Sequence, residues 1–195
     1  MRQAVRRRAL LSGVAAAGGT LAVAWHLGKP SAPPASPGTR SHDIEALRRT
    51  DPPARLAPAE LVDAEGRAHH LEEFAGTGLV LNLWASWCLP CVTELPTLAG
   101  LARRVRPAGI LVLALSSDRG GAPVVEQYYR RHGIEGLPVW LDPKGAAARA
   151  WGAQGIPTTL IVDRQGRERG RMEGATDWTD EAAVAVIRQL ALAPP

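Results

Sequence analysis

Two cysteines separated by only two residues constrain this chain more than any other feature. Cys88 and Cys91 are the only cysteines in 195 residues. A disulfide between such near neighbours closes too short a loop to remove much entropy from the unfolded chain. A structural zinc site usually has four ligands, of which this pair would supply half. The spacing suits a dithiol that opens and closes: one sulfur attacks a substrate disulfide, and the other resolves the mixed disulfide.

The flanking residues place this pair between a strand and a helix. Residues 79–84 form an apolar run broken once by Asn82, which predicts a buried central strand. From Pro90 onward, apolar residues recur at spacings of three and four, which predicts a helix with proline in its first turn. Cys88 would then lie at the helix N-terminus, where unpaired amides and the helix dipole favour a thiolate. We therefore expect Cys88 to be the nucleophile and the more buried Cys91 to be the resolving thiol.

The segment over residues 81–91, LNLWASWCLPC, resembles the active-site segment of the thioredoxin superfamily. It is most similar to the exported, membrane-associated TlpA-like and ResA-like reductases, which include the cytochrome c maturation thioredoxins. Glu94 resembles a glutamate that tunes the thiols in that family, and Pro96 resembles a proline that kinks the active-site helix. Residues 155–159, GIPTT, resemble the segment whose cis-proline faces the dithiol. The resemblance covers residues 55–192.

The order of the predicted elements gives an α/β fold with a mixed sheet. In chain order, we expect a hairpin at 59–71, the active-site strand and helix, a strand at 110–115, a helix at 122–131, a strand at 138–141, a helix at 144–151, a hairpin of strands 158–162 and 167–173, and a closing helix at 180–192 with Thr179 as N-cap. With the resemblance, this is a thioredoxin fold with an N-terminal β-hairpin extension and a central strand–helix insertion.

The resemblance also gives roles to Pro157 and Glu94. A cis Ile156–Pro157 bond would put a backbone edge beside the sulfurs, where a substrate strand could pair near Ile156; the alternative is a trans proline that opens a strand. Glu94, one turn after Cys91, would raise the thiol pKa or transfer a proton during resolution; the alternative is a solvated helix residue. Asn82 occupies the place of a buried acid in thioredoxin, which moves the expected proton relay to Glu94. Alternatively, Asn82 only forms hydrogen bonds within its strand.

The residues around Cys88 are expected to contact the substrate. We expect Trp87 to be exposed and, with Leu89, Pro90 and Ile156, to form the contact surface; the alternative for Trp87 is a packing role. The dipeptide Leu89-Pro90 carries no charge that would stabilise a reduced thiolate, and this favours a reductant over an oxidant.

The charge distribution indicates export rather than a nucleic-acid partner. The chain has 23 basic and 19 acidic residues, a formal charge of +4. Residues 1–24 hold four arginines and no acid, so the remainder has 23 − 4 = 19 basic and 19 acidic residues. The basic excess therefore belongs to the N-terminus and is not a binding surface for nucleic acid.

Residues 1–27 have the layout of a signal peptide or a membrane anchor. Three arginines at 6–8 precede an uncharged stretch at 9–24, which ends in Ala-Val-Ala, a sequence typical of a cleavage site. If it is not cleaved, the segment 9–27 is near the lower length limit for spanning a bilayer and would tether the protein to the inner membrane. Either outcome predicts an exported protein, most simply in a bacterial periplasm.

Composition divides the rest of the chain into a Pro/Ala-rich linker over residues 28–54 and a thioredoxin-like domain over 55–195. An exported dithiol in an oxidising compartment is oxidised unless something re-reduces it. This, and the resemblance, imply a membrane thiol electron donor of the DsbD/CcdA type as one partner and a disulfide-containing protein substrate as the other.

The leading hypothesis is thus an enzyme without a cofactor that reduces protein disulfides. By resemblance, its substrates would be the haem-site cysteines of apocytochrome c or the copper-site cysteines of a respiratory oxidase subunit. The alternative is a thioredoxin-fold copper chaperone that uses both cysteines and a histidine. Such chaperones have three residues between their cysteines, and Pro157 would obstruct metal ligation. A peroxidase would need a lone cysteine with a preceding Pro and Thr, which Cys88 lacks.

Other conspicuous residues are expected to be structural. His69 and His70 are neighbours on a predicted strand and point to opposite faces, so they do not easily share a metal ion. Arg164 and the three alternate arginines that follow it are expected to form a solvated face. The remaining tryptophans are expected to pack in the core or at its edge, and they are Trp84, Trp140, Trp151 and Trp178.

Overall fold

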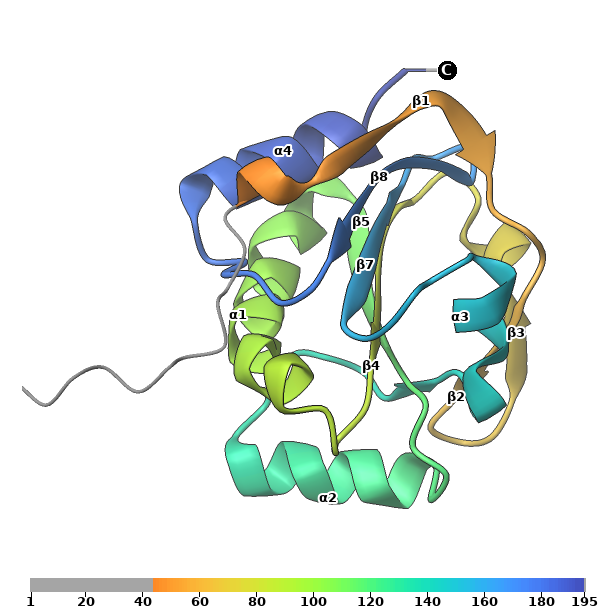
Figure 1. Cartoon of the computed structure of the whole chain (residues 1–195), viewed down its shortest axis with the longest axis vertical. Helices are drawn as coiled ribbons and strands as arrows, with labels where there is room; N and C mark the ends of the chain where they lie inside the picture. Colours follow the sequence, from red (N-terminus) through yellow and green to blue (C-terminus); the bar gives the residue numbers. More distant parts are fainter. Residues whose placement is uncertain (1–43, 195) are drawn as a thin grey trace, which may run out of the picture. The chain divides into compact units, whose positions relative to one another are not determined.

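The computed structural model describes residues 44–194, in which eight strands form one mixed sheet (Figure 1). The strands are β1 (Arg48–Arg55), β2 (Glu60–Asp63), β3 (Ala68–His70), β4 (Gly78–Trp84), β5 (Ile110–Ser116), β6 (Trp140–Leu141), β7 (Thr158–Val162) and β8 (Arg167–Glu173). The helices are α1 (Leu89–Val105), α2 (Ala122–His132), α3 (Ala146–Ala150) and α4 (Glu181–Ala191), with short 3₁₀ turns at Ile44–Ala46, Leu71–Phe74, Arg106–Ala108 and Pro143–Gly145. The predictions for residues 1–27 and for 28–43 fall outside the described residues.

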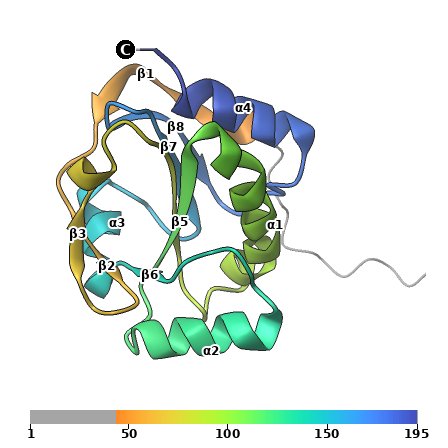
Figure 2. The same ribbon diagram turned by 180° about the vertical axis from the view of Figure 1, so that it is seen from behind.

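The sheet has the order β1-β8-β7-β4-β5-β6-β2-β3, with β4 parallel to β5 and antiparallel to β7. Helices α1 and α4 lie on one face of its centre, and α3 lies on the other (Figures 1 and 2). The predicted α/β fold is confirmed, since β2 and β3 form the N-terminal hairpin while α2, β6 and α3 form the insertion.

Strand β4 is buried along its whole length and divides the core in two. Leu79, Leu81 and Leu83 pack on the α3 side, whereas Val80 and Trp84 pack on the α1 side. Because side chains alternate between the faces of a strand, Asn82 also points to the α1 side. The one polar residue of this strand is therefore directed towards the helix that carries the cysteines.

Helix α2 packs at the end of β4 that leads into the cysteine segment. Trp84 stacks on Tyr129 at a ring-centroid distance of 5.9 Å and meets Tyr128 edge-on at 5.7 Å. The insertion is thereby held beside the loop that connects β4 to α1. This arrangement brings the insertion within reach of anything that binds at the cysteines.

The linker prediction is corrected at its C-terminal end. Residues 48–54, which we expected to lie in the linker, belong to β1, which pairs antiparallel with β8. The pairing is irregular between Arg49 and Ala54, where Pro52 and Pro53 cannot donate backbone hydrogen bonds. Two prolines in this segment made it look like a linker, but prolines are tolerated in an edge strand.

The prediction of a solvated arginine face on β8 is wrong. The Nε atoms of Arg167 and Arg169 donate to Oδ2 of the fully buried Asp163 at 3.0 and 2.6 Å. Arg171 pairs with Glu168, Nη2 to Oε2, at 2.8 Å. All three side chains are at least three-quarters buried, and of the four arginines Arg164 alone is exposed. The sequence pattern of alternate arginines did not reveal their partners, which are Asp163 and Glu168 on the same hairpin.

The boundaries of two other elements also differ from the predictions. The short strand expected at 138–141 is confined to Trp140–Leu141. The N-cap of α4 is Asp180, whose side chain accepts a hydrogen bond from the backbone N–H of Ala182 at 3.0 Å. Thr179, the expected N-cap, instead donates its hydroxyl to Asp177.

Candidate active site

Cys88 and Cys91 form a disulfide across the first turn of α1. Cys88 is the N-cap of this helix, and its Sγ lies 3.3 Å from the backbone N–H of Cys91, which donates to it. Cys88 has 7% of its surface exposed, whereas Cys91 has none. An incoming nucleophile or a substrate disulfide can therefore reach Cys88 alone, and in the reduced state the helix N-terminus would stabilise a thiolate at this sulfur.

The loop before β7 faces the disulfide from a distant part of the chain. The Ile156–Pro157 peptide bond is cis, as expected from the resemblance. The carbonyl oxygen of Ile156 lies 3.6 Å from Sγ of Cys88. The structure thus brings Cys88, Ile156 and Pro157 together, and the alternative of a trans proline is wrong.

Glu94 lies behind the cysteines, on the inner face of α1. It is three residues after Cys91 and only 2% exposed, so the alternative of a solvated residue is wrong. Oε1 accepts from Nδ2 of Asn82 at 2.8 Å, and Oε2 accepts from the backbone N–H of Thr176 and from Nε1 of Trp178, each at 3.2 Å. Burial raises the pKa of Glu94 to about 7, although these hydrogen bonds oppose the shift. A carboxyl group with this pKa can both accept and release a proton near neutral pH.

Asn82 joins three elements beneath the disulfide. Its Nδ2 donates to Glu94 on α1 and also to Oγ1 of Thr159 on β7, at 2.9 Å. The alternative in which Asn82 bonds only within its own strand is therefore wrong. Its Oδ1 is buried and accepts no hydrogen bond from the part of the chain that the structure describes.

The exposed side of the site is apolar. Trp87 and Leu89 flank Cys88 and are 71% and 66% exposed, as expected for Trp87. Pro90 is half-buried in the first turn of α1. Exposed apolar side chains of this size around a reactive group are typical of a surface that binds another protein.

Asp118 fixes the loop that carries Trp87, a role that the sequence reasoning missed. Its carboxylate accepts from the backbone N–H and the hydroxyl of Ser86 at 2.9 and 2.8 Å, and from the hydroxyl of Ser116 at 2.7 Å. Trp178, Thr176 and Thr159 were also missed as partners of the buried polar cluster. No local pattern marks them, since each lies more than 60 residues from its partner in the chain.

His69, one of the two neighbouring histidines, is held between two carboxylates. Both ring nitrogens of His69 bond to carboxylates: Nδ1 to Glu73 at 2.8 Å and Nε2 to Asp63 at 3.1 Å. Within residues 44–194, no group of three or more His, Cys, Asp or Glu side chains is arranged to hold a metal ion. In the same range, no helix combines the length and the apolar character needed to cross a membrane.

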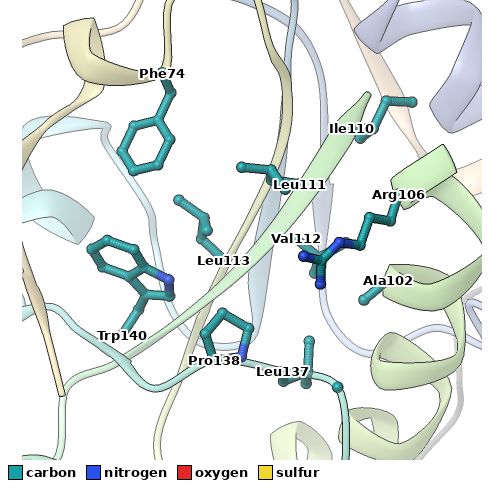
Figure 3. A pocket seen from close by; sticks show the side chains of 11 residues that line it. Phe74, Ala102, Arg106, Ile110, Leu111, Val112, Leu113, Leu137, Pro138 and Trp140 are labelled. Atoms are coloured by element: carbon teal, nitrogen blue, oxygen red, sulfur yellow. The ribbon is translucent and has the colours of Figure 1, made fainter. Parts of the chain in front are cut away.

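A separate hollow of about 450 Å³ lies along the outer edge of β5. Its lining is mainly apolar, and Arg106 and Trp140 lie on opposite sides of it (Figure 3). None of its lining residues belongs to the segment 84–91 that surrounds the cysteines. We therefore do not assign it to the active site.

A thioredoxin fold that carries a Cys-x-x-Cys disulfide at a helix N-terminus, with a cis-proline against the outer sulfur, defines a thiol–disulfide oxidoreductase. The sequence gives the particular family: residues 53–169 match the AhpC/TSA family, and the chain belongs to it.

Relatives in this family support the same class of enzyme. The thiol-disulfide oxidoreductase ResA of Geobacillus thermodenitrificans is 33% identical over 122 residues, which cover 62% of this chain and 68% of that protein. ResA of Geobacillus kaustophilus is 30% identical over 122 residues, with the same coverage.

Solved structures with a similar fold include two bacterial proteins. The exposed lipoprotein thioredoxin Etrx1 of Streptococcus pneumoniae has a TM-score of 0.58 and 25% identity, covering 69% of this chain and all of that one. A DsbF homologue from Corynebacterium diphtheriae has a TM-score of 0.61 at 20% identity, covering 77% and 95%, and supports the fold alone.

Proposed function

We propose that this protein is an extracytoplasmic reductant of protein disulfides. The observation that carries the proposal is the unequal placement of the two sulfurs: Cys88 caps a helix N-terminus and keeps 7% of its surface exposed, whereas Cys91 is fully buried, one helical turn before an acid with a pKa of about 7. This asymmetry suits an attacking thiolate and a resolving thiol whose proton needs a nearby acceptor.

In the proposed cycle the reduced dithiol gives two electrons to the substrate. The Cys88 thiolate attacks one sulfur of the substrate disulfide, that S–S bond breaks, and the leaving thiolate takes up a proton. Cys91 then gives its proton to the Glu94 carboxylate and attacks Sγ of Cys88. The Cys88–Cys91 disulfide forms, the mixed disulfide between Cys88 and the substrate breaks, and the second substrate sulfur leaves as a thiolate that takes up a proton from solvent. Pro157 and Ile156 would position the substrate, and Trp87, Leu89 and Pro90 would contact it.

The reducing direction is supported by the uncharged dipeptide Leu89-Pro90 between the cysteines, since strong oxidants stabilise their reduced thiolate more extensively. By the family resemblance, the substrates would be haem-site cysteines of apocytochrome c or copper-site cysteines of a respiratory oxidase. A copper chaperone is not favoured, because within residues 44–194 no third His, Cys, Asp or Glu side chain is arranged with the two cysteines to hold a metal ion.

Export is part of the proposal and rests on the sequence of the N-terminus. Residues 1–27 would be a signal peptide or an inner-membrane anchor, and the domain would lie in the periplasm. In that compartment a membrane thiol donor of the DsbD/CcdA type would re-reduce the disulfide. The similarity to an exposed lipoprotein thioredoxin of Streptococcus pneumoniae is in keeping with this location.

The reduction potential of the Cys88–Cys91 pair tests whether the protein reduces or oxidises its substrates. Equilibration of the protein with glutathione or dithiothreitol buffers should give a potential between about −270 mV, the value for thioredoxin, and about −200 mV, the upper range for glutaredoxins. A value near −120 mV, which is typical of strong oxidants, would overturn the reductant proposal and indicate disulfide formation instead.

A further inference from the structure

A second hollow, of about 1010 Å³, opens directly beside the exposed Trp87. Its walls come from three loops: the cysteine segment, the residues after β5, and the turn between β6 and α3. The turn between β6 and α3 belongs to the insertion, and the residues after β5 lead into it. We propose that this hollow is a groove that binds an acidic segment of the substrate protein next to the disulfide to be reduced. This inference rests on the proposed function and names the kind of substrate.

The free charges of the groove are positive. Arg119 and Lys144 line it and are exposed, and neither side chain forms an ion pair or a hydrogen bond within the described residues. The one acid in the lining is Asp118, whose two carboxylate oxygens already accept three hydrogen bonds from Ser86 and Ser116. An incoming carboxylate would therefore meet two unpaired cations and one anion, so the lining keeps an excess of positive charge, and the oxygens of the anion are turned toward neutral donors.

The backbone conformation of Lys144 supports a functional role for its charged side chain. Lys144 has φ of 61°, and it is the one residue other than glycine with a positive φ between residues 44 and 194. This left-handed conformation is unfavourable for a residue with a Cβ atom, and glycine would adopt it freely. Such strained residues cluster at functional sites. The chain also uses arginine 21 times and lysine twice, so a lysine here is not a product of composition.

The turn that carries Lys144 is well anchored. The carbonyl oxygen of Lys144 accepts from Nη1 of Arg149 at 2.5 Å, and the backbone N–H of Gly145 donates to the carbonyl of Asp142 at 3.0 Å. The Asp142 carboxylate caps α3 through the N–H groups of Ala147 and Ala148. The ammonium group is thus presented from a fixed base at the rim of the groove.

Trp87 connects the groove to the chemistry. It precedes Cys88 in the chain, lines the hollow and is 71% exposed. A substrate segment that pairs near Ile156 would continue past Cys88 and over the indole ring into the groove. Apolar contact with Trp87 and the positive charges of Arg119 and Lys144 would then select substrates by the residues that flank the target cysteine.

The test compares two synthetic peptides that contain the same intramolecular disulfide. One peptide has two glutamates beside a cysteine, and the other has glutamines in their place. The rate constant for oxidation of the reduced full-length protein by each peptide is measured at low and high salt. We expect the acidic peptide to react faster by about two- to fivefold for each basic residue engaged, the range for exposed ion pairs, with the advantage falling at high salt.

Variants of the basic residues test whether Lys144 and Arg119 cause the faster reaction of the acidic peptide. Lys144→Gly removes the charge at a position where glycine relieves backbone strain, so a lower rate cannot be ascribed to misfolding. Lys144→Gly and Arg119→Ala should each reduce the advantage of the acidic peptide, and Lys144→Glu should reverse it. Arg164→Ala removes another exposed arginine, at the far end of β7 from Pro157, and should leave the advantage unchanged.

Three results would overturn the proposal. Equal rates for the two peptides with the unaltered protein would refute binding of an acidic segment in the groove, but would not contradict the proposed reductant function. An advantage that survives both Lys144→Gly and Arg119→Ala would also refute the groove. Reduction of neither peptide would refute the reductant function itself and the groove with it.

Discussion

Glu94 and Asp163 are both almost fully buried, but their pKa values shift in opposite directions. Glu94 is 2% exposed and its pKa is raised to about 7, mainly by burial. Asp163 is fully buried, yet its pKa is lowered, because hydrogen bonds from the backbone and from Arg169 and Arg167 outweigh the effect of burial. The difference lies in the donors: three neutral groups surround Glu94, whereas two guanidinium groups bind Asp163.

The contrast separates a structural acid from a reactive one. Asp163 closes the β7–β8 turn and accepts from the backbone N–H groups of Gln165 and Arg167, so its permanent charge stabilises the fold. Glu94 has no cationic partner in the described chain, so its charge is not fixed near neutral pH. A group held in this way is suited to move a proton, and it lies one turn from the sulfur that is proposed to lose one.

The largest expected effect is on stability, from Asp163→Ala. This change leaves Arg167 and Arg169 facing each other without their shared anion. Breaking a buried ion pair in this way costs about 3 kcal/mol of unfolding free energy, at the low end of the usual range because both arginines retain some exposure. Urea unfolding of the oxidised protein at pH 7 measures the loss.

The neighbouring Arg164→Ala is the matched control, since it removes an exposed arginine and should change stability by less than about 0.5 kcal/mol. A loss below about 1 kcal/mol for Asp163→Ala would contradict the view that its charge holds the turn. The reduction potential of the cysteine pair should stay as in the unaltered protein in both variants.

The next effect is a pH dependence of stability caused by Glu94. Its pKa is about 7 in the folded protein and 4.5 ordinarily, so the folded state binds the proton more tightly. Stability should therefore fall as the pH rises from about 4.5 through 7, by about 3 kcal/mol in total, at 1.36 kcal/mol per pKa unit. Glu94→Gln should remove this fall.

The difference between the two stability curves isolates Glu94. The raised pKa of His69 gives a fall of the same sign above pH 6.5, but it is present in both proteins and cancels. Acids with lowered pKa values, such as Asp163, change stability below their ordinary pKa of 3.8. Parallel curves for the two proteins between pH 4.5 and 7 would mean that Glu94 is ionised throughout, and the contrast with Asp163 would be lost.

Much of the active site could be predicted because its signals are local. The apolar run, Pro90 and the helical spacing place Cys88 at a strand-to-helix junction within a dozen residues of sequence. Burial of Glu94 could not be derived in this way, because it depends on Asn82 from β4 and Trp178 from the far end of the chain. The same limit applies to β1, which is a strand only because β8 offers it an edge.

A smaller effect is expected when a donor to Glu94 is removed. Trp178→Phe deletes the Nε1–H that bonds Oε2 and keeps most of the ring's volume. Since this bond favours the ionised carboxylate, its loss should raise the pKa of Glu94 further, by up to about one unit. In single-turnover reactions, the pH midpoint for release of the second substrate thiol should move upward.

Trp151→Phe is the matched control, because its Nε1 donates to the carbonyl of Ala57 on the opposite face of the sheet. It should leave the midpoint in place. A midpoint that is unchanged in Trp178→Phe, or equally shifted in both variants, would show that the indole does not act through Glu94.

Asp180 extends the comparison to an exposed carboxylate and gives the smallest expected effect. It caps α4 with one hydrogen bond, has no cationic partner in the described residues, and lies beside solvent. Asp180→Ala should therefore lower the free energy of unfolding by about 1 kcal/mol, the usual value for an N-cap. Thr179→Ala, which removes the expected cap but leaves the observed one, should have a smaller effect. The two variants differ by one position, so urea unfolding under identical conditions compares them directly; a larger loss for Thr179→Ala would restore the assignment that the sequence favoured.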